Sequence, residues 1–366
     1  MFKDTLISER PAPLASTGLI GWLRANLFSG PINSLVTLAG LYGLYLLLVP
    51  IIDWAFIRAD WVGASRDACV SGGACWVFIG NRLQQFTYGF YPTAELWRIN
   101  LTFLLFVGQL LWLALPRLPG KLWLAPFMVV VFPFIAYVLL YGGWFGLVEV
   151  PTHQWGGLTL TLILAVVGIT AALPIGILLA LGRRSNMPIV RSLSVVFIEF
   201  WRGVPLITVL FMSSVMLPLF VPQELTLDKL LRAMIGIIFF QSAYMAEVVR
   251  GGLQAIPKGQ YEAAEALGLN YWKMMVLVVL PQALKLMIPG IVNTFIALFK
   301  DTSLVLIIGL FDLLAIVQAG LADPNWLGYA TEGYVFAGLV FWVFCYGMSK
   351  YSQYLERKLH TGHKKR

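Results

Sequence analysis

Four charged side chains interrupt long apolar stretches of the sequence, and each could bind a charged solute. Lys300 and Asp301 lie within residues 286–310, and Glu199 and Arg202 lie within residues 195–220. A charged side chain at the centre of a membrane helix costs about 2.5 to 3.5 kcal/mol on insertion scales, so it needs a functional reason or a partner. Ammonium, guanidinium and carboxylate groups together could bind both ends of a zwitterion.

Lys300 and Asp301 are adjacent, so on a helix they point about 100° apart and do not simply pair with each other. One arrangement places Lys300 on a substrate carboxylate, with Asp301 facing an amino group or a neighbouring helix. The alternative is that both are held in buried structural pairs. Asn293, Thr294 and Ser303 could supply neutral hydrogen bonds along the same segment.

Glu199 and Arg202 are three residues apart and therefore share a helical face, and residues 203–205 (Gly-Val-Pro) should interrupt that helix. A broken helix exposes backbone dipoles that could meet a zwitterion. The alternative is a structural ion pair that stabilises the break. Glu247 and Arg250 have the same spacing near the end of another apolar stretch, and we interpret them as a gate or an anchor.

A polar segment, residues 251–285, separates two of the apolar stretches and is too long for a tight turn. Pro257 can open a helix, residues 261–267 are good helix formers, and Gly268 can end the helix in the left-handed conformation. We therefore predict a short helix parallel to the membrane that inserts into a groove of a partner protein. The alternative is an interfacial helix that only anchors the loop.

This segment also carries a recognisable spacing pattern. Its members are Glu262, Ala263, Ala264, Gly268, Val278, Leu280 and Pro281. The pattern resembles the EAA loop of binding-protein-dependent ABC importers, EAA-x3-G-x9-I-x-LP, and departs from it only in Val278. Residues 199–206, 243–252, 256–260 and 300–304 resemble the polar amino-acid branch of these permeases, and the resemblance covers residues 153–359.

The resemblance implies a permease subunit that imports L-amino acids. Its implied partners are an ABC ATPase dimer, which would hold ATP and Mg, a second homologous permease subunit and a periplasmic amino-acid-binding protein. The extra N-terminal helices look like the M-type subunit of general L-amino-acid permeases. Related chains often carry Glu where Thr294 stands, which argues against a strong preference for cationic substrates. The residues expected to couple to the ATPase are Tyr261, Glu262, Ala263, Ala264, Gly268 and Pro281.

Composition independently indicates a membrane protein. The 366-residue chain is 59% hydrophobic and 12% charged, with a mean hydropathy of +0.80, far from soluble averages. A bilayer core of about 30 Å needs roughly 20 apolar helical residues. We predict an all-α integral membrane fold, a five-helix ABC importer permease core preceded by three extra helices. The eight predicted spans are residues 34–52, 96–115, 122–141, 158–181, 195–220, 230–249, 286–310 and 334–350.

The distribution of lysine and arginine predicts the orientation. Most of the 26 basic residues lie near the N-terminus, in the segments around 117–121, 183–191 and 250–285, or in the tail, whereas residues 142–157 and 312–333 contain none. Both termini are therefore expected in the cytoplasm of a bacterium, with the chain in its inner membrane. The predicted parts are a cytoplasmic or interfacial segment 1–33, a three-helix extension 34–152 with an extracytoplasmic loop 53–93, a permease core 153–350 with a coupling loop 251–285, and a basic tail 351–366.

Several function classes lack their sequence signatures. Cys69 and Cys75 could form a disulfide in the extracytoplasmic loop or stay as free thiols, but three cysteines exclude a disulfide scaffold. No HExxH, clustered Cys/His or G-x4-GK[ST] pattern is present, so we predict no metal site, no cofactor in this chain and no ATPase activity. The net charge of +8 forms no patch with interleaved aromatics, so membrane lipid is expected as a partner and nucleic acid is not.

Three alternatives to an ABC permease that itself binds the substrate remain open. An ion- or proton-coupled transporter could use Glu199, Lys300 and Asp301 as a relay, and a noncatalytic scaffold would leave the substrate site to its partner subunit. A membrane enzyme has the least support, because the three histidines are dispersed in loops and the tail. Whether uptake requires ATP or an ion gradient distinguishes the ABC permease from the ion-coupled transporter, and substitution of Lys300 and Asp301 tests the scaffold alternative.

Overall fold

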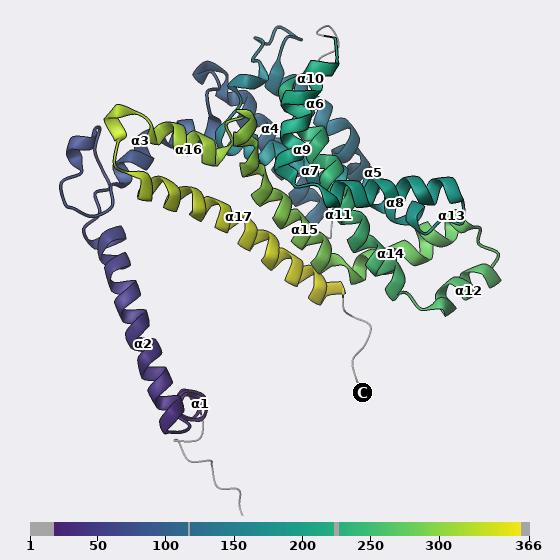
Figure 1. Ribbon diagram of the computed structural model, residues 1–366, viewed down its shortest axis with the longest axis horizontal. Coiled ribbons are helices and arrows are strands. Elements are labelled where there is room, and N and C mark those ends of the chain that lie inside the picture. The colour runs from purple at the N-terminus through teal and green to yellow at the C-terminus, as the bar shows by residue number, and fades with distance from the viewer. Residues whose placement is uncertain (1–17, 116–117, 223–226, 360–366) are drawn as a thin grey trace, which may run out of the picture. The chain divides into compact units, whose positions relative to one another are not determined.

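The computed structural model describes residues 18–115, 118–222 and 227–359, and its named elements are all helical, which confirms the all-α prediction. The chain divides into two compact units between Gly80 and Asn81. Figure 1 shows the helices of both units. Residues 1–17 and 360–366, which belong to the predicted N-terminal segment and basic tail, lie outside the described residues. The segment boundaries at 33, 152 and 350 stay predictions.

Unit 1 consists of α1 (Gly18–Asn26), α2 (Pro31–Ile52) and a loop that leads into α3 (Trp76–Tyr88). A π-helical turn, η1 (Asp53–Ile57), prolongs α2, so the candidate span covers Pro31–Ile57. The side chains of α2 are almost all exposed within unit 1, and such an apolar helix is suited to contact with lipid.

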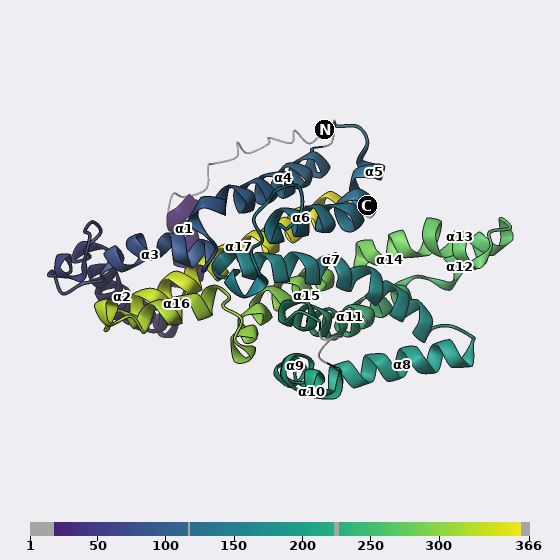
Figure 2. The ribbon, with the colours of Figure 1, turned by 90° about the horizontal axis from the view of Figure 1, so that it is seen from above.

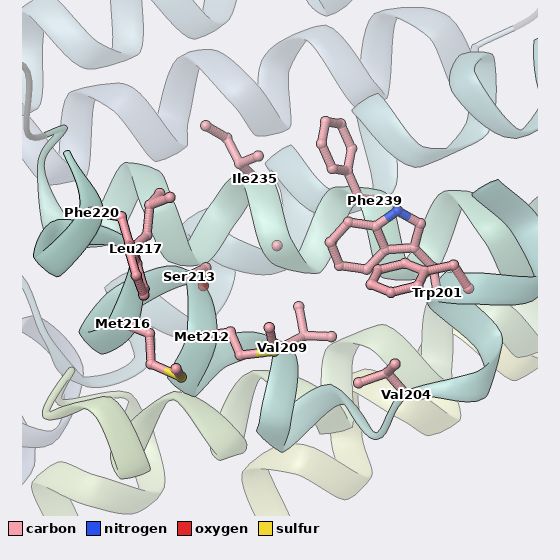
Figure 3. Close-up of a pocket in the computed structure, with 12 residues that line it drawn as sticks. Trp201, Val204, Val209, Met212, Ser213, Met216, Leu217, Phe220, Ile235 and Phe239 are labelled. Carbon is pink, nitrogen blue, oxygen red and sulfur yellow. The ribbon is translucent and has the colours of Figure 1, made fainter. Parts of the chain in front are cut away.

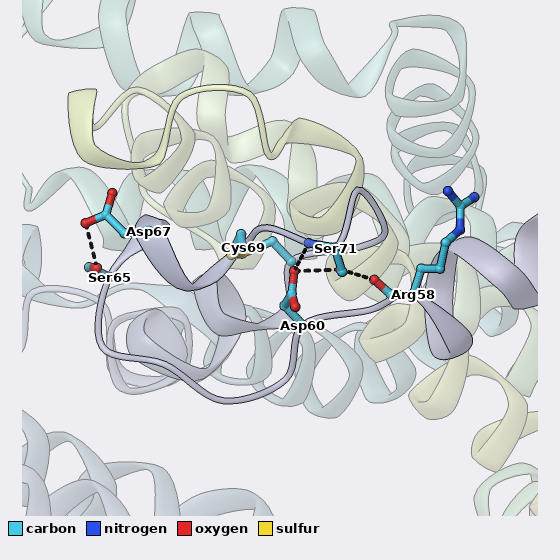
Figure 4. Close-up of a disulfide and its surroundings, with 7 residues drawn as sticks. Arg58, Asp60, Ser65, Asp67, Cys69 and Ser71 are labelled. Carbon is cyan, nitrogen blue, oxygen red and sulfur yellow. Dashed lines mark hydrogen bonds between the residues drawn. A yellow bond between two sulfur atoms is a disulfide. The ribbon is translucent and has the colours of Figure 1, made fainter.

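The loop between η1 and α3 is closed by a disulfide between Cys69 and Cys75, whose Cα atoms are 5.5 Å apart. Figure 4 shows Asp60 beside this disulfide. The Oδ2 atom of Asp60 accepts hydrogen bonds from the Ser71 hydroxyl at 2.7 Å and from the Ser71 backbone N–H at 3.1 Å. These two bonds stabilise the ionised carboxylate and so lower the pKa of Asp60.

Unit 2 contains the remaining long apolar helices. In the described residues, three further candidate spans are single helices: α7 (Gly157–Arg183), α11 (Lys229–Ala255) and α17 (Ala330–Leu359). The span Thr93–Ala114 consists of η3 (Thr93–Glu95) and α4 (Leu96–Ala114), and the span Ile288–Ile308 consists of α15 (Ile288–Asp301) and η9 (Thr302–Ile308). The span Lys121–Tyr141 consists of α5 (Lys121–Pro126), η4 (Phe127–Val131) and α6 (Phe132–Tyr141). These spans match seven of the eight predicted ones, including α2, to within several residues.

The eighth predicted span, residues 195–220, is not one helix. It is divided into α8 (Pro188–Gly203) and a second piece made of α9 (Leu206–Phe211), η6 (Met212–Met216) and α10 (Leu217–Phe220), and the two pieces are bent by 101°. The break occurs where the sequence predicts it. Pro205 has no N–H to donate, and Val204 before it takes the extended conformation that proline favours.

α7 and α11 run side by side in the same direction through unit 2 (Figures 1 and 2). Gly176 of α7 allows this close approach, because a Cβ atom there would lie 2.7 Å from Met245. A Cβ atom at Gly168 would instead lie 3.0 Å from Leu298 of α15. Buried apolar residues form two clusters along the pair. One surrounds Leu210, Ile237 and Leu298, and the other surrounds Leu253 and Ala264.

Residues 312–333, predicted only as a segment without basic residues, contain the short helix α16 (Leu313–Leu321) and η10 (Pro324–Trp326). The carboxylate of Asp312 caps α16 by accepting from the N–H groups of Leu314 and Ala315 at 3.2 and 3.0 Å. The start of α7 is held beside this segment, because Gly157 N–H donates to the carbonyl of Phe311, just before the segment, at 2.8 Å and Leu313 N–H donates to the Thr161 hydroxyl.

Asp312 predicts a pH dependence of stability. Burial raises the pKa of this carboxyl to about 6, above its usual value of 3.8, although the capping bonds oppose the shift. Between about pH 4 and 6 the Asp312 carboxyl is protonated in the folded state but ionised in the unfolded state. The free energy of unfolding should therefore fall as the pH rises through this range. Asp312→Asn keeps the cap without the charge, and its Tm in detergent should fall less than that of wild type over this range. The exposed Asp67→Asn is the control, and identical profiles for Asp312→Asn and wild type would contradict the prediction.

Candidate functional site

The predicted short helix is present as α12 (Lys258–Ala266), which follows directly on α11. Ile256 and Pro257 between the two helices are extended, so α12 starts where Pro257 was predicted to open it. At its other end Gly268 has a φ of +74°, the left-handed conformation that side chains other than that of glycine resist. In the two views of Figures 1 and 2, α12 and α13 (Tyr271–Met274) lie at the end of unit 2 opposite α16.

The inner side of α12 is fixed to the helices beneath it. Ala264 is only 2% exposed and belongs to the same buried cluster as Leu253, Met274 and Val279. These residues come from α11, α13 and η8 (Met275–Val279), which continues into α14 (Leu280–Leu286). Because an alanine fills the contact, the backbone of α12 can lie close to this cluster.

Two polar contacts add to this packing. The Tyr261 hydroxyl donates to the Leu253 carbonyl of α11 at 3.2 Å and accepts from Arg184 Nη1 at 3.2 Å, and the Arg184 guanidinium lies 5.7 Å from the Tyr261 ring centroid. Gln282 Nε2 of α14 donates to Gln260 Oε1 at 3.0 Å. α12 is therefore held to α7, α11 and α14 at once.

The outer side of α12 is exposed and chemically simple. It presents Glu262, Ala263, Glu265, Ala266 and, just beyond the helix, Leu267, whose exposed fraction is 80%. Pro281 is exposed in the first turn of α14, where a missing N–H leaves no helical hydrogen bond unmade. Small and acidic side chains on a helix held rigidly from behind are suited to insertion into a groove of another protein.

Charged groups near the same end of the bundle form an ion network, defined here as Arg183, Glu199, Arg202, Glu247 and Arg250. Glu247 is its centre: Oε1 accepts from Arg183 Nη1 at 2.7 Å, and Oε2 accepts from Arg250 Nη2 and Nε at 2.6 and 3.0 Å. Arg183 also donates to Glu199 at 2.9 Å, and Arg202 lies 3.8 Å from Glu247. The network ties the end of α7 and the last turn of α8 to α11.

This network differs from the arrangement expected from sequence. Among the described residues, Glu199 and Arg202 pair not with each other but with Arg183 and Glu247. Glu247 and Arg250, predicted as a gate or anchor, do form a pair. Arg183 was missed, because next to Arg184 it was interpreted only as part of the basic loop that sets the orientation. Its position in the last turn of α7 was the available signal.

The elbow between α8 and α9 encloses an apolar cavity of about 350 Å³ against α11. Figure 3 shows Trp201 and Phe239 at one end of this cavity, with Met212, Met216 and Phe220 farther along it. Ser213 supplies the only side-chain hydroxyl among the described lining residues. A zwitterion needs several polar partners, and the side chains of this lining offer few. The substrate contact suggested for the broken helix stays a prediction.

The other predicted pathway residues lie along α15 and the start of η9. Lys300 is exposed and Asp301 is half-buried, and among the described residues neither side chain forms a hydrogen bond or ion pair. The Thr294 and Ser303 hydroxyls donate to the Gly290 and Lys300 carbonyls. Asn293 is exposed. The α-helix ends at Asp301 and tightens into a 3₁₀-helix, so the regular helix assumed from sequence is absent there.

The structure thus separates the predicted pathway residues into two groups. Glu199 and Arg202 belong to the ion network. Lys300 and Asp301 lie instead at the end of α15, which also carries Asn293 and Thr294, and Ser303 follows in η9. Their role in substrate contact stays a prediction.

The family model for binding-protein-dependent transport system inner membrane components matches residues 172–361, a stretch that includes α8, the ion network and α12. The chain belongs to this family. Its members are transport subunits of ABC transporters, which work with an ATPase and a binding protein. Membership agrees with the candidate spans, and the chain is a multi-pass membrane protein.

Relatives extend the similarity beyond the family region to the N-terminal helices. The chain is 61% identical to the inner membrane amino-acid ABC transporter permease protein YhdY of Escherichia coli K12, over 96% of each chain. It is 40% identical to the glutamate/glutamine/aspartate/asparagine transport system permease protein BztC of Rhodobacter capsulatus, over 99% of this chain and 98% of that one. A crystal structure of an amino-acid ABC transporter with histidines aligns with 28% identity and a TM-score of 0.49, covering 55% of this chain and 92% of that chain.

Proposed function

We propose that this chain is a permease subunit of an ABC importer that carries L-amino acids into the cytoplasm, driven by ATP hydrolysis on a separate subunit. The amino-acid substrate is supported by the similarity to YhdY and BztC over nearly the whole chain. The coupling role of α12 is supported by one structural observation above all. Its inner side is fixed to three helices through Ala264, Tyr261 and Gln260, while its outer side is free for a partner.

In this proposal α12 faces the cytoplasm and docks on an ATPase dimer, which binds ATP and Mg. The basic residues near this end, Arg183, Arg184, Arg191 and Lys273, support the orientation through the positive-inside rule. A second homologous permease subunit and a periplasmic amino-acid-binding protein complete the proposed assembly. The loop that carries the Cys69–Cys75 disulfide would then lie on the oxidising, periplasmic side.

Lys300 and Asp301 are the proposed contacts for the carboxylate and amino groups of the substrate. The support is that both are charged, sit within a candidate span, and have no paired side chain among the described residues. Uptake by the reconstituted complex with Lys300→Met and Asp301→Asn tests this assignment. Unchanged uptake in both variants would instead favour a scaffold role for this subunit.

Reversing the charge of Glu262 tests the docking proposal. Glu262 is exposed on the outer side of α12, and no hydrogen bond or ion pair within the described residues uses its side chain. Glu262→Lys should therefore leave this subunit folded but weaken its contact with the ATPase. We expect at least a fivefold loss of ATP-driven uptake in proteoliposomes, with a smaller loss of ATP hydrolysis.

The matched control is Lys258→Glu, a charge reversal at the first residue of the same helix, which should change uptake less than twofold. Normal coupling in Glu262→Lys would count against docking through this side. Uptake that persists without the ATPase and collapses with the ion gradient would instead support the ion-coupled alternative.

A further inference from the structure

A second, larger cavity separates the N-terminal extension from the permease core within unit 2. Its volume is about 670 Å³, and its lining comes from α4, η4 and α6 on one side and from α7 and the start of α11 on the other. Every one of these helices belongs to a candidate membrane span. Most of its lining therefore belongs to segments that can cross the hydrocarbon region of a bilayer.

The body of this cavity is apolar and elongated. Phe103, Val129, Ala136, Val167 and Ala171 are typical of its lining. Its lining residues on α7 extend from Leu162 to Ile175, which is about 20 Å along a helix with a rise of roughly 1.5 Å per residue. One leaflet of the hydrocarbon core is about 15 Å deep. The cavity therefore has the length and polarity that a lipid acyl chain requires.

One end of the cavity is polar and acidic. Asp228 lines it and accepts from the Thr152 hydroxyl at 2.6 Å, while also capping α11. The Tyr141 hydroxyl, from another lining residue, donates to the exposed carboxylate of Glu149. One carboxylate therefore lines this end of the largely apolar cavity, which we call its mouth, and a second is hydrogen-bonded to a lining residue. This end of α11 is the one opposite α12.

Aromatic rings surround the same mouth. The ring centroids of Tyr137 and Tyr141 are 5.3 Å apart, and Trp144 lies 6.2 and 6.4 Å from them. Tyrosine and tryptophan are enriched at the membrane–water interface, and their faces attract ammonium groups. The rings and the two carboxylates thus favour a cationic group over an anionic one.

The basic side chains on neighbouring elements, including Arg232 one turn after Asp228 in α11, do not line the cavity. No lysine or arginine is among the described lining residues. Lys229 follows Asp228 in sequence, but its side chain reaches Gly309. A Cβ atom built on Gly309 would lie 3.5 Å from the Lys229 Nζ atom. Arg98 is fully buried and donates to the carbonyls of Leu139, Leu140 and Val148.

We propose that this cavity is a binding site for a glycerophospholipid with a primary ammonium head group, such as phosphatidylethanolamine. One acyl chain lies between α6 and α7, and the ammonium group lies at the mouth formed by Glu149, Asp228 and the three aromatic rings. The lipid fills the space between the extension and the core, so it acts as a structural component of the joint between them.

The test measures the lipid that stays bound, independently of transport. The full chain is assembled in nanodiscs containing equal amounts of phosphatidylethanolamine and phosphatidylglycerol, transferred to detergent and analysed by native mass spectrometry. We expect one phosphatidylethanolamine per chain, retained at least fivefold over phosphatidylglycerol. Absence of bound lipid, or equal or greater retention of phosphatidylglycerol, would overturn the proposal, and this measurement on wild type needs no variant to fold.

Variants then separate the tail site from the head-group site. Ala171→Phe and Ala136→Phe fill the cavity and should each reduce retained lipid at least tenfold, whereas Leu104→Phe, on an exposed position of α4 outside the lining, should retain it. Glu149→Gln should keep a bound lipid but lower the preference for phosphatidylethanolamine at least threefold, and Asp67→Asn should not. Equal retention in all variants would mean adventitious annular lipid only and would also overturn the proposal.

Discussion

A tryptophan in place of Ala264 should reduce ATP-driven amino-acid uptake at least tenfold while the ATPase subunits continue to hydrolyse ATP. Ala264 is 2% exposed and contacts the cluster beneath α12, so an indole there has no space. Overpacking of a buried site typically costs about 1 to 3 kcal/mol, and the least constrained response is displacement of α12 from α11 and α14. A displaced α12 would still reach the ATPase but would not transmit its motion.

The measurement compares uptake and hydrolysis in the same proteoliposomes. Ala255→Trp is the matched control, because Ala255 is exposed at the last residue of α11 and lies outside the buried cluster. It should change uptake less than twofold. If Ala264→Trp kept the wild-type ratio of uptake to hydrolysis, the packing of α12 against the bundle could not be what couples the two activities.

The second large effect on uptake should come from substitution of Glu247, because its carboxylate forms ion pairs with three arginines. In Glu247→Gln, Arg250 loses its hydrogen-bonded charge partner, Arg183 keeps only Glu199, and Arg202 loses its ion pair. Hydrogen bonds to charged groups contribute roughly 1.5 to 3 kcal/mol each, and Glu247 is only 17% exposed, so water replaces them incompletely. We expect a loss of several degrees in Tm and at least a tenfold loss of uptake.

Glu199→Gln is the matched comparison within the same network. In the part of the chain that the structure describes, Glu199 forms one ion pair, with Arg183, and its side chain is 53% exposed, where ion pairs contribute little. Its uptake should fall less than threefold, with little change in Tm. Equal effects of the two substitutions on stability and uptake would show that Glu247 is not the centre of the network.

The features that were predictable from sequence depend on local chemistry. Pro205 breaks α8 from α9 because the restrictions on proline and on the residue before it act within a few residues. Gly268 ends α12 for a similarly local reason. The apolar spans were also predictable, because the bilayer requires a minimum length of helix regardless of tertiary packing.

Other features depend on residues that are distant in sequence. Arg183 and Glu247 form an ion pair although 64 residues separate them, and nothing in their local patterns indicates this contact. α16 was missed because its apolar run is too short for a span and its capping Asp312 resembled an ordinary loop residue. The lipid-sized cavity depends on the spacing between α6 and α7, which sequence periodicity does not specify.

The contact between α7 and α11 has a mechanical consequence. Each helix is 27 residues long, or about 40 Å at a rise of roughly 1.5 Å per residue, and the contact at Gly176 leaves little room for one to slide past the other. The pair therefore behaves as a single stiff beam, clamped near Asp228 and Gly157 at one end and to α12 at the other. A push on α12 is therefore carried along the whole length of the pair to the contacts at Asp228 and Gly157.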